Sequence, residues 1–318
     1  MQTMAHVDAQ PSEYPNGQAA EAAILQGADH VIACLDANRI GNLRELLETT
    51  GAPHLCLFKG ELAEEAGDAA PWLVKLRPGD KLLRMLQATS LPARMNPFAL
   101  REAEAGIFIH TDMSLADLRQ HLRRFLRVAT ADGRNFLFRF WEPSIAAVYF
   151  AGLNDRPDMI TRWFTSREGG AISRIVAPLV GTDAERIVNI VPHDLPAGAP
   201  PPSGAFKLSQ GDVWQFQQVR LNRDIERLAG RLIETFPEAV QKIEGISIGD
   251  FTRKGVSRMM QFGFSKQSYL FTLLAWDLHY GPRFEHRDPD RILTQILTGQ
   301  EPQAQRFEQL KARMAQIG

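Results

Sequence analysis

The sequence predicts an α/β lobe, with a mixed sheet and flanking helices, followed by an all-helical lobe. Three observations predict this. Short apolar runs that are typical of buried strands alternate with helical patterns between residues 29 and 150. Five prolines between Pro192 and Pro202 then interrupt the regular pattern. Beyond about residue 221 only helical periodicity remains.

The same observations set four predicted segments. Residues 1–28 are polar and contain Pro11 and Pro15, so we expect a loose leader. Residues 29–150 form the α/β domain, and residues 151–220 form an irregular connector with a proline-rich loop and a hairpin. Residues 221–318 form the helical lobe.

Apolar runs bounded by turn residues predict the strands of the first lobe. These strands are His30–Leu35, His54–Phe58, Pro71–Leu76, Gly106–His110 and Asn135–Trp141. Helical spacing predicts short helices at Asn42–Glu48 and Lys81–Thr89. The clearest helix follows Ser114, a good N-cap that forms a capping box with Asp117.

The second half of the chain is read in the same way. Arg162–Thr165 and Ile187–Val191 are predicted strands, and Ala205–Leu208 with Val213–Val219 is a predicted hairpin. The helical lobe then contains five predicted helices. They are Asn222–Phe236, Ile248–Phe262, Gln267–Tyr280, Asp290–Leu297 and a last amphipathic helix through Phe307, Leu310, Met314 and Ile317.

Composition excludes several classes of function. The 318 residues include 36 Lys and Arg against 37 Asp and Glu, a net charge of -1, so no global field attracts nucleic acid or anionic lipid. No run of about 18 apolar residues or secretory signal is visible. Cys34 and Cys56 lie in apolar runs, which favours buried free thiols and a cytoplasmic location, with a disulfide between neighbouring strands as the alternative.

Signatures of catalysis and cofactor binding are missing. The sequence has no glycine-rich phosphate loop, no nucleophile elbow and no spaced metal ligands, so we expect no cofactor, no metal and no enzymatic activity. The alternative is a hydrolase in which His110 and Asp112, two apart at a strand end, orient a base or bind a metal. Three weaker alternatives are a metal site at His279 and His286 with Asp288 and Asp290, a Cys56–His54 pair, and acid–base work by Glu64, Glu65 and Asp68.

Two groups of residues are candidates for partner binding. The helical lobe concentrates Met and aromatic residues, which serve either as core or as an adaptable groove for a partner helix. These candidates are Phe251, Met259, Met260, Phe262, Phe264, Tyr269 and Phe271. Arg119, Arg123, Arg124 and Arg127 form a basic row on the helix after Ser114. The row is either a solvated face or a contact for phosphate or an acidic partner, which leaves a nucleic-acid module as a third option.

The order of motifs resembles a known family, the cytoplasmic effector chaperones or adaptors of bacterial type VI secretion systems, which carry a domain of unknown function. The matching segments are His30–Asp36, His54–Gly60, Ala70–Val74, Gly106–Ile109, Ser114–Phe125 and Phe138–Pro143. The family usually has Tyr and Asp where this chain has Trp141 and Glu142, and both changes keep the chemical type. The tail from Gly263 to Phe284 and on to Leu297 is similar to the helical tails of such proteins.

The resemblance implies a non-enzymatic role. Members bind a toxic effector, often through its N-terminal region, and help to load it onto the valine-glycine-repeat spike protein. The motif residues are structural in this interpretation: Arg139 pairs with Glu142, and Phe138, Phe140 and Trp72 are core residues. Trp141 and Pro143 complete the closing element, and Pro143 ends its strand. We therefore predict a scaffold in the first lobe and a partner against the helical lobe or between the lobes.

Overall fold

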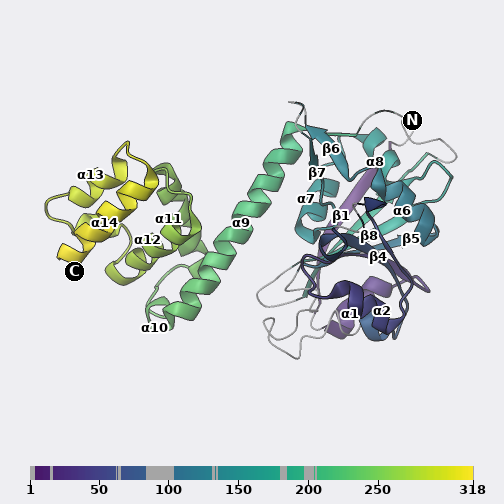
Figure 1. The fold of residues 1–318 in the computed structure, drawn as a ribbon, viewed down its shortest axis with the longest axis horizontal. Helices are drawn as coiled ribbons and strands as arrows, with labels where there is room; N and C mark the ends of the chain where they lie inside the picture. The colour runs from purple at the N-terminus through teal and green to yellow at the C-terminus, as the bar shows by residue number, and fades with distance from the viewer. Residues whose placement is uncertain are drawn as a thin grey trace. The chain divides into compact units, whose positions relative to one another are not determined.

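The structure is a computed structural model, and it describes residues 4–14, 17–61, 63, 66–83, 104–130, 133, 135–179, 185–196, 204 and 206–317. The chain divides into two compact units, residues 1–216 and residues 217–318 (Figure 1). The first is built on a sheet and the second on helices, which confirms the predicted fold class. Glu64, Glu65 and most of the predicted helix Lys81–Thr89 lie outside the described residues.

The first unit contains a seven-stranded sheet with the order β1-β9-β8-β5-β2-β4-β3, in which every neighbouring pair is antiparallel. Its strands are β1 (His6–Tyr14), β2 (Val31–Asp36), β3 (His54–Cys56), β4 (Pro71–Leu76), β5 (Gly106–Thr111), β8 (Ile172–Leu179) and β9 (Glu185–His193). A second sheet has three strands, β6 (Arg127–Thr130), β7 (Asn135–Leu137) and β10 (Lys207–Leu208), and contains the parallel pair β10–β6.

Helices cover both faces of the large sheet. They are α1 (Gly17–Leu25), α2 (Leu43–Thr50), the 3-10 turn η1 (Gly67–Ala69), α6 (Leu115–Arg123), α7 (Pro143–Ala151) and α8 (Pro157–Phe164). Side chains alternate along a strand. Val31, Ala33 and Leu35 of β2 therefore face the core shared with α1 and α2. Ile32 and Cys34 face the core shared with α6, α7 and α8, on the opposite side of the sheet (Figure 1).

Gly106 allows β5 to lie against β2. A Cβ atom at this position would stand 2.1 Å from the backbone oxygen of Cys34, far inside van der Waals contact. Any other residue would force the two central strands apart. The glycine that opens the predicted strand is thus required by the register of the sheet.

The predicted leader is wrong. Residues 6–14 are the edge strand β1, which pairs with β9 along its whole length, and α1 follows directly. Val7 is buried, and its backbone N–H donates to Oδ1 of Asn154 at 2.7 Å. The N-terminal segment is therefore part of the first unit.

The predicted connector is also wrong in most of its elements. The segment predicted as a strand at Arg162–Thr165 is the end of helix α8, and Val213–Val219 lies within the long helix α9 (Gln210–Thr235) rather than in a hairpin. The strand at Ile187–Val191 is confirmed as part of β9, and β8 and β9 belong to the large sheet. The strand predicted at Asn135–Trp141 ends at Leu137.

The second unit is built from helices around one apolar core. They are the greater part of α9, α10 (Pro237–Val240), α11 (Ile248–Gln261), α12 (Gln267–Tyr280), the 3-10 turn η3 (Phe284–Arg287), α13 (Ile292–Thr298) and α14 (Gln303–Ile317). The core gathers Leu228 and Leu232 of α9 with Leu273 and Leu274 of α12 and Leu310 of α14. Among the described residues, every helix is too short or too polar to cross a membrane.

Candidate functional site

Arg139 is the centre of an ion-pair cluster in the first unit. Its Nε lies 2.6 Å from Oε1 of Glu142, and its Nη2 pairs with Oδ2 of Asp36. Glu142 immediately precedes α7, and Asp36 ends β2, where its side chain is 1% exposed. The predicted pair of Arg139 and Glu142 is confirmed, and Asp36 adds a second carboxylate. The cluster ties the end of a central strand to the start of a helix.

Local geometry fixes both carboxylates. Oδ1 of Asp36 accepts the backbone N–H of Asn38 at 3.0 Å, which shapes the turn after β2. Glu142 has extended backbone angles, and Pro143 at the first helical position has a backbone geometry suited to starting α7. Nη2 of Arg39 lies 4.0 Å from Oε2 of Glu142. Paired charges with so little exposed surface serve structure better than chemistry.

The aromatic motif residues are core residues. Trp72 is buried and donates its Nε1–H to the backbone oxygen of Gly67 at 3.0 Å. Phe138 contacts Tyr149 edge to face, with ring centroids 5.0 Å apart, and Trp141 is 1% exposed. Phe138 and Trp141 belong to a group of rings that includes Trp163, whose Nε1 donates to the hydroxyl of Tyr149 at 2.9 Å, whereas Trp72 packs in the core on the other face of the sheet. Large buried rings of this kind stabilise a fold strongly.

His110 and Asp112 do not form a catalytic pair. A register irregularity between His110 and Thr111 in β5 breaks the alternation that would place them on one face. His110 is buried, and its Nε2 lies 2.7 Å from the backbone oxygen of Ile24. Burial, with help from Arg174, lowers the pKa of His110 to about 4. Asp112 is exposed and accepts the backbone N–H of Ala171 at 2.7 Å.

The basic row is shorter than predicted. The helix α6 ends at Arg123, and Arg127 belongs to strand β6, so the row does not continue along one helix. Nη2 of Arg119 donates to the backbone oxygen of Phe58 at 2.6 Å, whereas Arg123 is exposed. The N-cap at Ser114 is confirmed, because its Oγ accepts the backbone N–H of Asp117 at 3.2 Å and donates to Oδ2 of Asp117 at 2.6 Å.

The cysteines and the candidate metal ligands are not assembled into sites. Cys34 and Cys56 are free thiols, buried and half-buried respectively, and burial raises the pKa of both. Within the described ranges, no cluster of three or more His, Cys, Asp or Glu side chains has a geometry suited to a metal ion. Asp288 instead accepts the backbone N–H of Leu293 at 3.0 Å and pairs with Arg313.

The predicted partner-binding residues of the second unit fall into two groups. Met259 and Phe264 are completely buried, and Phe251 is 8% exposed. Phe262 and Tyr269 are half-buried, and the ring of Tyr269 stacks on Phe307 with centroids 4.2 Å apart. Met260 alone of the set is strongly exposed, at 45%. The buried members form the core that joins α11 to α12, and Met260 presents an apolar side chain to solvent.

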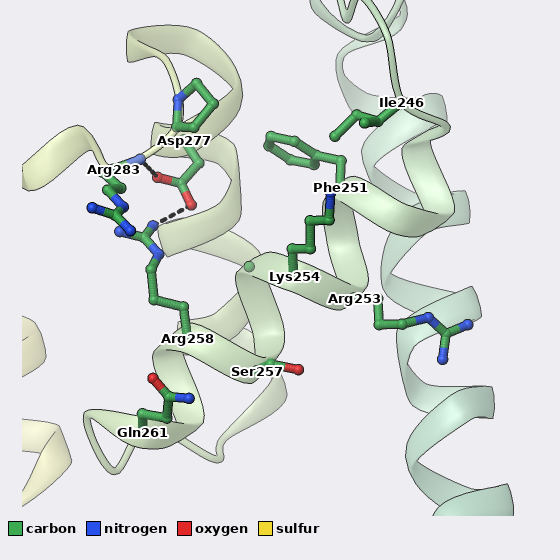
Figure 2. Close-up of a pocket in the computed structure, with 11 residues that line it drawn as sticks. Ile246, Phe251, Arg253, Lys254, Ser257, Arg258, Gln261, Asp277 and Arg283 are labelled. Atoms are coloured by element: carbon green, nitrogen blue, oxygen red, sulfur yellow. Dashed lines mark hydrogen bonds and ion pairs between the residues drawn. The ribbon is translucent and has the colours of Figure 1, made fainter.

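A cavity of about 570 Å³ lies beside α11 in the second unit (Figure 2). Four cationic side chains line it, against the single carboxylate of Asp277. Apolar groups form the other walls. The residues that line the cavity include Ile246, Phe251, Arg253, Lys254, Arg258, Asp277, Pro282 and Arg283.

Arg258 anchors one wall of this cavity. Its guanidinium pairs with Asp277 of α12 and with Glu285 of η3, two carboxylates that are 4% and 5% exposed. Oδ1 of Asp277 also accepts the backbone N–H groups of Arg283 at 2.9 Å and Phe284 at 3.2 Å. Burial raises the pKa of Asp277 although Arg258 opposes the shift. These contacts join α11, α12 and the segment that follows α12.

Sequence reasoning missed this cavity. Its cations come from α11 and from the turn after α12, so no single motif contains them. One signal was available. Residues 251–270 include Arg253, Lys254, Arg258 and Lys266 but no Asp or Glu. Beyond Asp250 in its first turn, the helix that contains the first three of these cations has no acidic residue, which indicates a positive charge that is only partly balanced within the helix.

Residues 33–157 match the model of the family described as Domain of unknown function (DUF4123). The matched region begins in β2 and ends at the start of α8, so it contains the Arg139 cluster and the central strands. Neither a curated protein nor a solved structure matches the chain significantly.

Proposed function

We propose that this protein is a cytoplasmic adaptor that binds a type VI secretion effector and helps to load it onto the secretion spike. The observation that carries the proposal is the match of residues 33–157 to the DUF4123 family, which is generally associated with such adaptors. The proposal includes contact with the N-terminal region of the effector and with the spike protein. It assigns no catalytic reaction to the chain.

The properties of the second unit support a role in partner binding. Met260 exposes 45% of its surface on α11 and lines a smaller cavity, of about 220 Å³, with Leu221 and Ile225 of α9 and Leu270 of α12. Flexible, polarisable methionine side chains adapt to the shape of a bound apolar surface. We propose that this part of the second unit contacts the effector.

The first test is affinity purification of the full-length tagged protein from its native cells. We expect one large secreted protein to co-purify, and we expect delivery of that protein to stop when the adaptor is removed while secretion of the spike continues. Turnover of a substrate that His110→Ala abolishes without unfolding the protein would contradict the proposal and favour the hydrolase alternative.

A matched pair of variants tests the contact surface. Met260→Asp adds a charge to the proposed surface, and Ile233→Asp adds the same charge at a residue of α9 that is also 45% exposed but does not line that cavity. Met260→Asp is expected to reduce recovery of the effector at least tenfold, with Ile233→Asp close to wild type. Met259 is unsuitable for this purpose because it is completely buried, so a charge there would unfold the unit.

A further inference from the structure

The cavity beside α11 contains two cations without partners. In the part of the chain that the structure describes, the side chains of Lys254 and Arg283 make no hydrogen bond or ion pair, and both are exposed at the wall of the cavity (Figure 2). The Nη1 of Arg253 donates only to the neutral Oδ1 of Asn222, at 2.7 Å. None of the three cations Arg253, Lys254 and Arg283 is therefore paired with a carboxylate among the described residues.

The single acidic side chain in the wall is already occupied. Oδ1 of Asp277 accepts two backbone N–H groups, and its Oδ2 pairs with Arg258. Arg258 is itself held by Asp277 and Glu285. Asp277 is thus unable to turn toward Lys254 or the side chain of Arg283 without losing several bonds. These bonds fix the position of Asp277, and the two free cations face a space that is open to an anionic group.

The backbone at Arg283 supports this interpretation. Arg283 has a φ of +67°, the left-handed conformation that side chains other than glycine, asparagine and aspartate adopt rarely. Asp277 holds this conformation through the N–H groups of Arg283 and Phe284. Non-glycine residues held in such conformations concentrate at binding sites.

The remaining walls are apolar. Phe251 and Ile246 line the cavity opposite the turn that contains Arg283, and Ile246 is 38% exposed. Pro282 lines it from the turn itself. A ligand that satisfies the whole cavity needs anionic groups for Lys254 and Arg283 and an apolar group for Phe251 and Ile246. Glutamate and aspartate next to a hydrophobic residue in a peptide provide both.

We propose that this cavity binds an acidic segment of the partner protein, with carboxylates on Lys254 and Arg283 and an apolar side chain against Phe251. The inference rests on the proposed adaptor function and adds the chemistry of the partner segment. A protein segment fits better than nucleic acid because the apolar wall has no use for a sugar-phosphate backbone, and because the chain has a net charge of -1.

A direct binding experiment uses the full-length protein and a fluorescein-labelled peptide in which four acidic residues flank a central phenylalanine. Fluorescence anisotropy at low salt is expected to give saturable binding to wild type. The double variant Lys254→Glu/Arg283→Glu is expected to bind at least about tenfold more weakly. The matched control is Lys266→Glu/Lys311→Glu, which reverses two exposed lysines of the same unit that do not line the cavity. The control is expected to stay within about twofold of wild type.

Two competitor molecules decide the class of ligand. The same peptide with its acidic residues changed to glutamine and asparagine is expected not to compete, and a single-stranded DNA of equal charge is expected to compete poorly. Equal competition by the DNA, equal competition by the neutral peptide, undetectable binding to wild type, or unchanged affinity in the cavity variant would each overturn the inference.

Purification from native cells separates this inference from the adaptor function. If wild type recovers the effector and Lys254→Glu/Arg283→Glu recovers it equally well, the cavity is not the site of contact and the adaptor function stands. If wild type recovers no effector, the adaptor function fails whatever the peptide does. Recovery by wild type and loss in the folded double variant supports both.

Discussion

Each unit contains an arginine held between two buried carboxylates. In the first unit Arg139 lies between Asp36 and Glu142, and in the second unit Arg258 lies between Asp277 and Glu285. Each cluster joins elements that are distant in the sequence. The chemistry of the two clusters is the same, so a difference in their roles has to come from their surroundings.

Those surroundings differ in what remains unpaired. The Arg139 cluster borders the aromatic core around Phe138 and Trp141, and it uses its charges internally. The Arg258 cluster borders an open cavity in which, among the described residues, Lys254 and Arg283 have no hydrogen-bond or ion-pair partner for their side chains. An ion-pair cluster next to a closed core acts as a structural joint. The same cluster beside unpaired cations acts as the fixed wall of a binding site.

The largest expected effect that would test this difference is the loss of Arg139. Arg139→Met removes the arginine that pairs with the buried Asp36 and the nearest cation of Glu142, and we expect a loss of about 3 kcal/mol in the free energy of unfolding of the first unit. This is the lower end of the usual range because the side chain of Arg139 is 32% exposed. Urea unfolding followed by tryptophan fluorescence measures it.

A matched control and a reporter make that measurement specific. Arg123→Met removes an exposed arginine of α6 and is expected to change stability by no more than about 0.5 kcal/mol. In a Trp276→Phe background, the remaining tryptophans Trp72, Trp141, Trp163 and Trp214 all belong to the first unit. If Arg139→Met lowers the free energy of unfolding as little as the control does, the Arg139 cluster does not act as a structural joint.

Acid is expected to weaken the first unit through its buried histidines. Burial is the main cause that lowers the pKa of His121 to about 4, and Arg124 lowers it further. The bond to the backbone oxygen of Trp163 and the charge of Glu168 oppose this shift. Because the unfolded chain binds the proton near pH 6.5, stability is complete above that pH and falls toward pH 4. For His121 the loss from pH 7.5 to pH 5 is about 2 kcal/mol.

The pKa of His110 is lowered in the same way, so its loss of stability in acid adds to that of His121. The measurement is urea unfolding of the first unit at pH 7.5, 6 and 5. His121→Gln is expected to make the pH dependence shallower, and His286→Gln, at an exposed histidine of the second unit, is expected to leave it unchanged. A steep pH dependence that survives in His121→Gln would assign the effect to other groups.

The second unit is expected to resist the same acid. Arg313 holds the pKa of Asp288 well below its usual range, so the stability from this pair is present above about pH 4 and is lost only as the pH falls further. Asp277 has a raised pKa, so its effect on the stability of the second unit is opposite to that of Asp288. Protonation of this buried carboxyl as the pH falls favours the folded state. Circular dichroism at pH 5 should therefore still show the helices of the second unit. If the helices of the second unit are lost at pH 5 while the first unit is still stable, the second unit is the more acid-sensitive of the two and this expectation is wrong.

The sequence predicts the central strands well and the edge of the sheet badly. Strand β2 is buried on both faces and appears as an uninterrupted apolar run, which is easily recognised. Strand β1 is an edge strand with mostly exposed side chains and Pro11 in its middle, so its residues resemble a loop. Pairing with β9 orders it, together with the contacts of Val7, and a partner strand 171 to 187 residues away has no local signature.

Helix α8 and the first part of α9, before the predicted helix Asn222–Phe236, were missed although each begins with a recognisable signal. Pro157 is at the first helical position of α8, and Ser209 with Asp212 forms a reciprocal capping box at the start of α9. Among the site residues, Arg139 and Glu142 are three apart and predictable as a pair. Arg258, Asp277 and Glu285 are separated by turns, and only the tertiary fold brings them together.

The smallest expected effect concerns the packing that holds the second cluster in place. At Gly255 of α11 a Cβ atom would stand 2.2 Å from Cδ2 of Leu274 in α12, so Gly255→Ala displaces the side chain of this buried leucine. We expect a loss of about 1–2 kcal/mol in the stability of the second unit. Gly230→Ala in α9 has open space around the added methyl group and is expected to stabilise the helix by up to about 1 kcal/mol.

The same substitution connects the two clusters to binding. Gly255 lines the cavity, and its added methyl group would displace the side chain of Leu274 and lie 3.8 Å from Oδ2 of Asp277. The substitution therefore disturbs the wall beside Arg283, whereas Arg139→Met leaves that wall intact. Gly255→Ala is therefore expected to weaken binding of the acidic peptide, and Arg139→Met in protein that remains folded is expected to leave it unchanged. If both variants weaken binding of the peptide equally, the Arg139 cluster and the Arg258 cluster do not differ in role. The distinction between a structural joint and the wall of a binding site then fails.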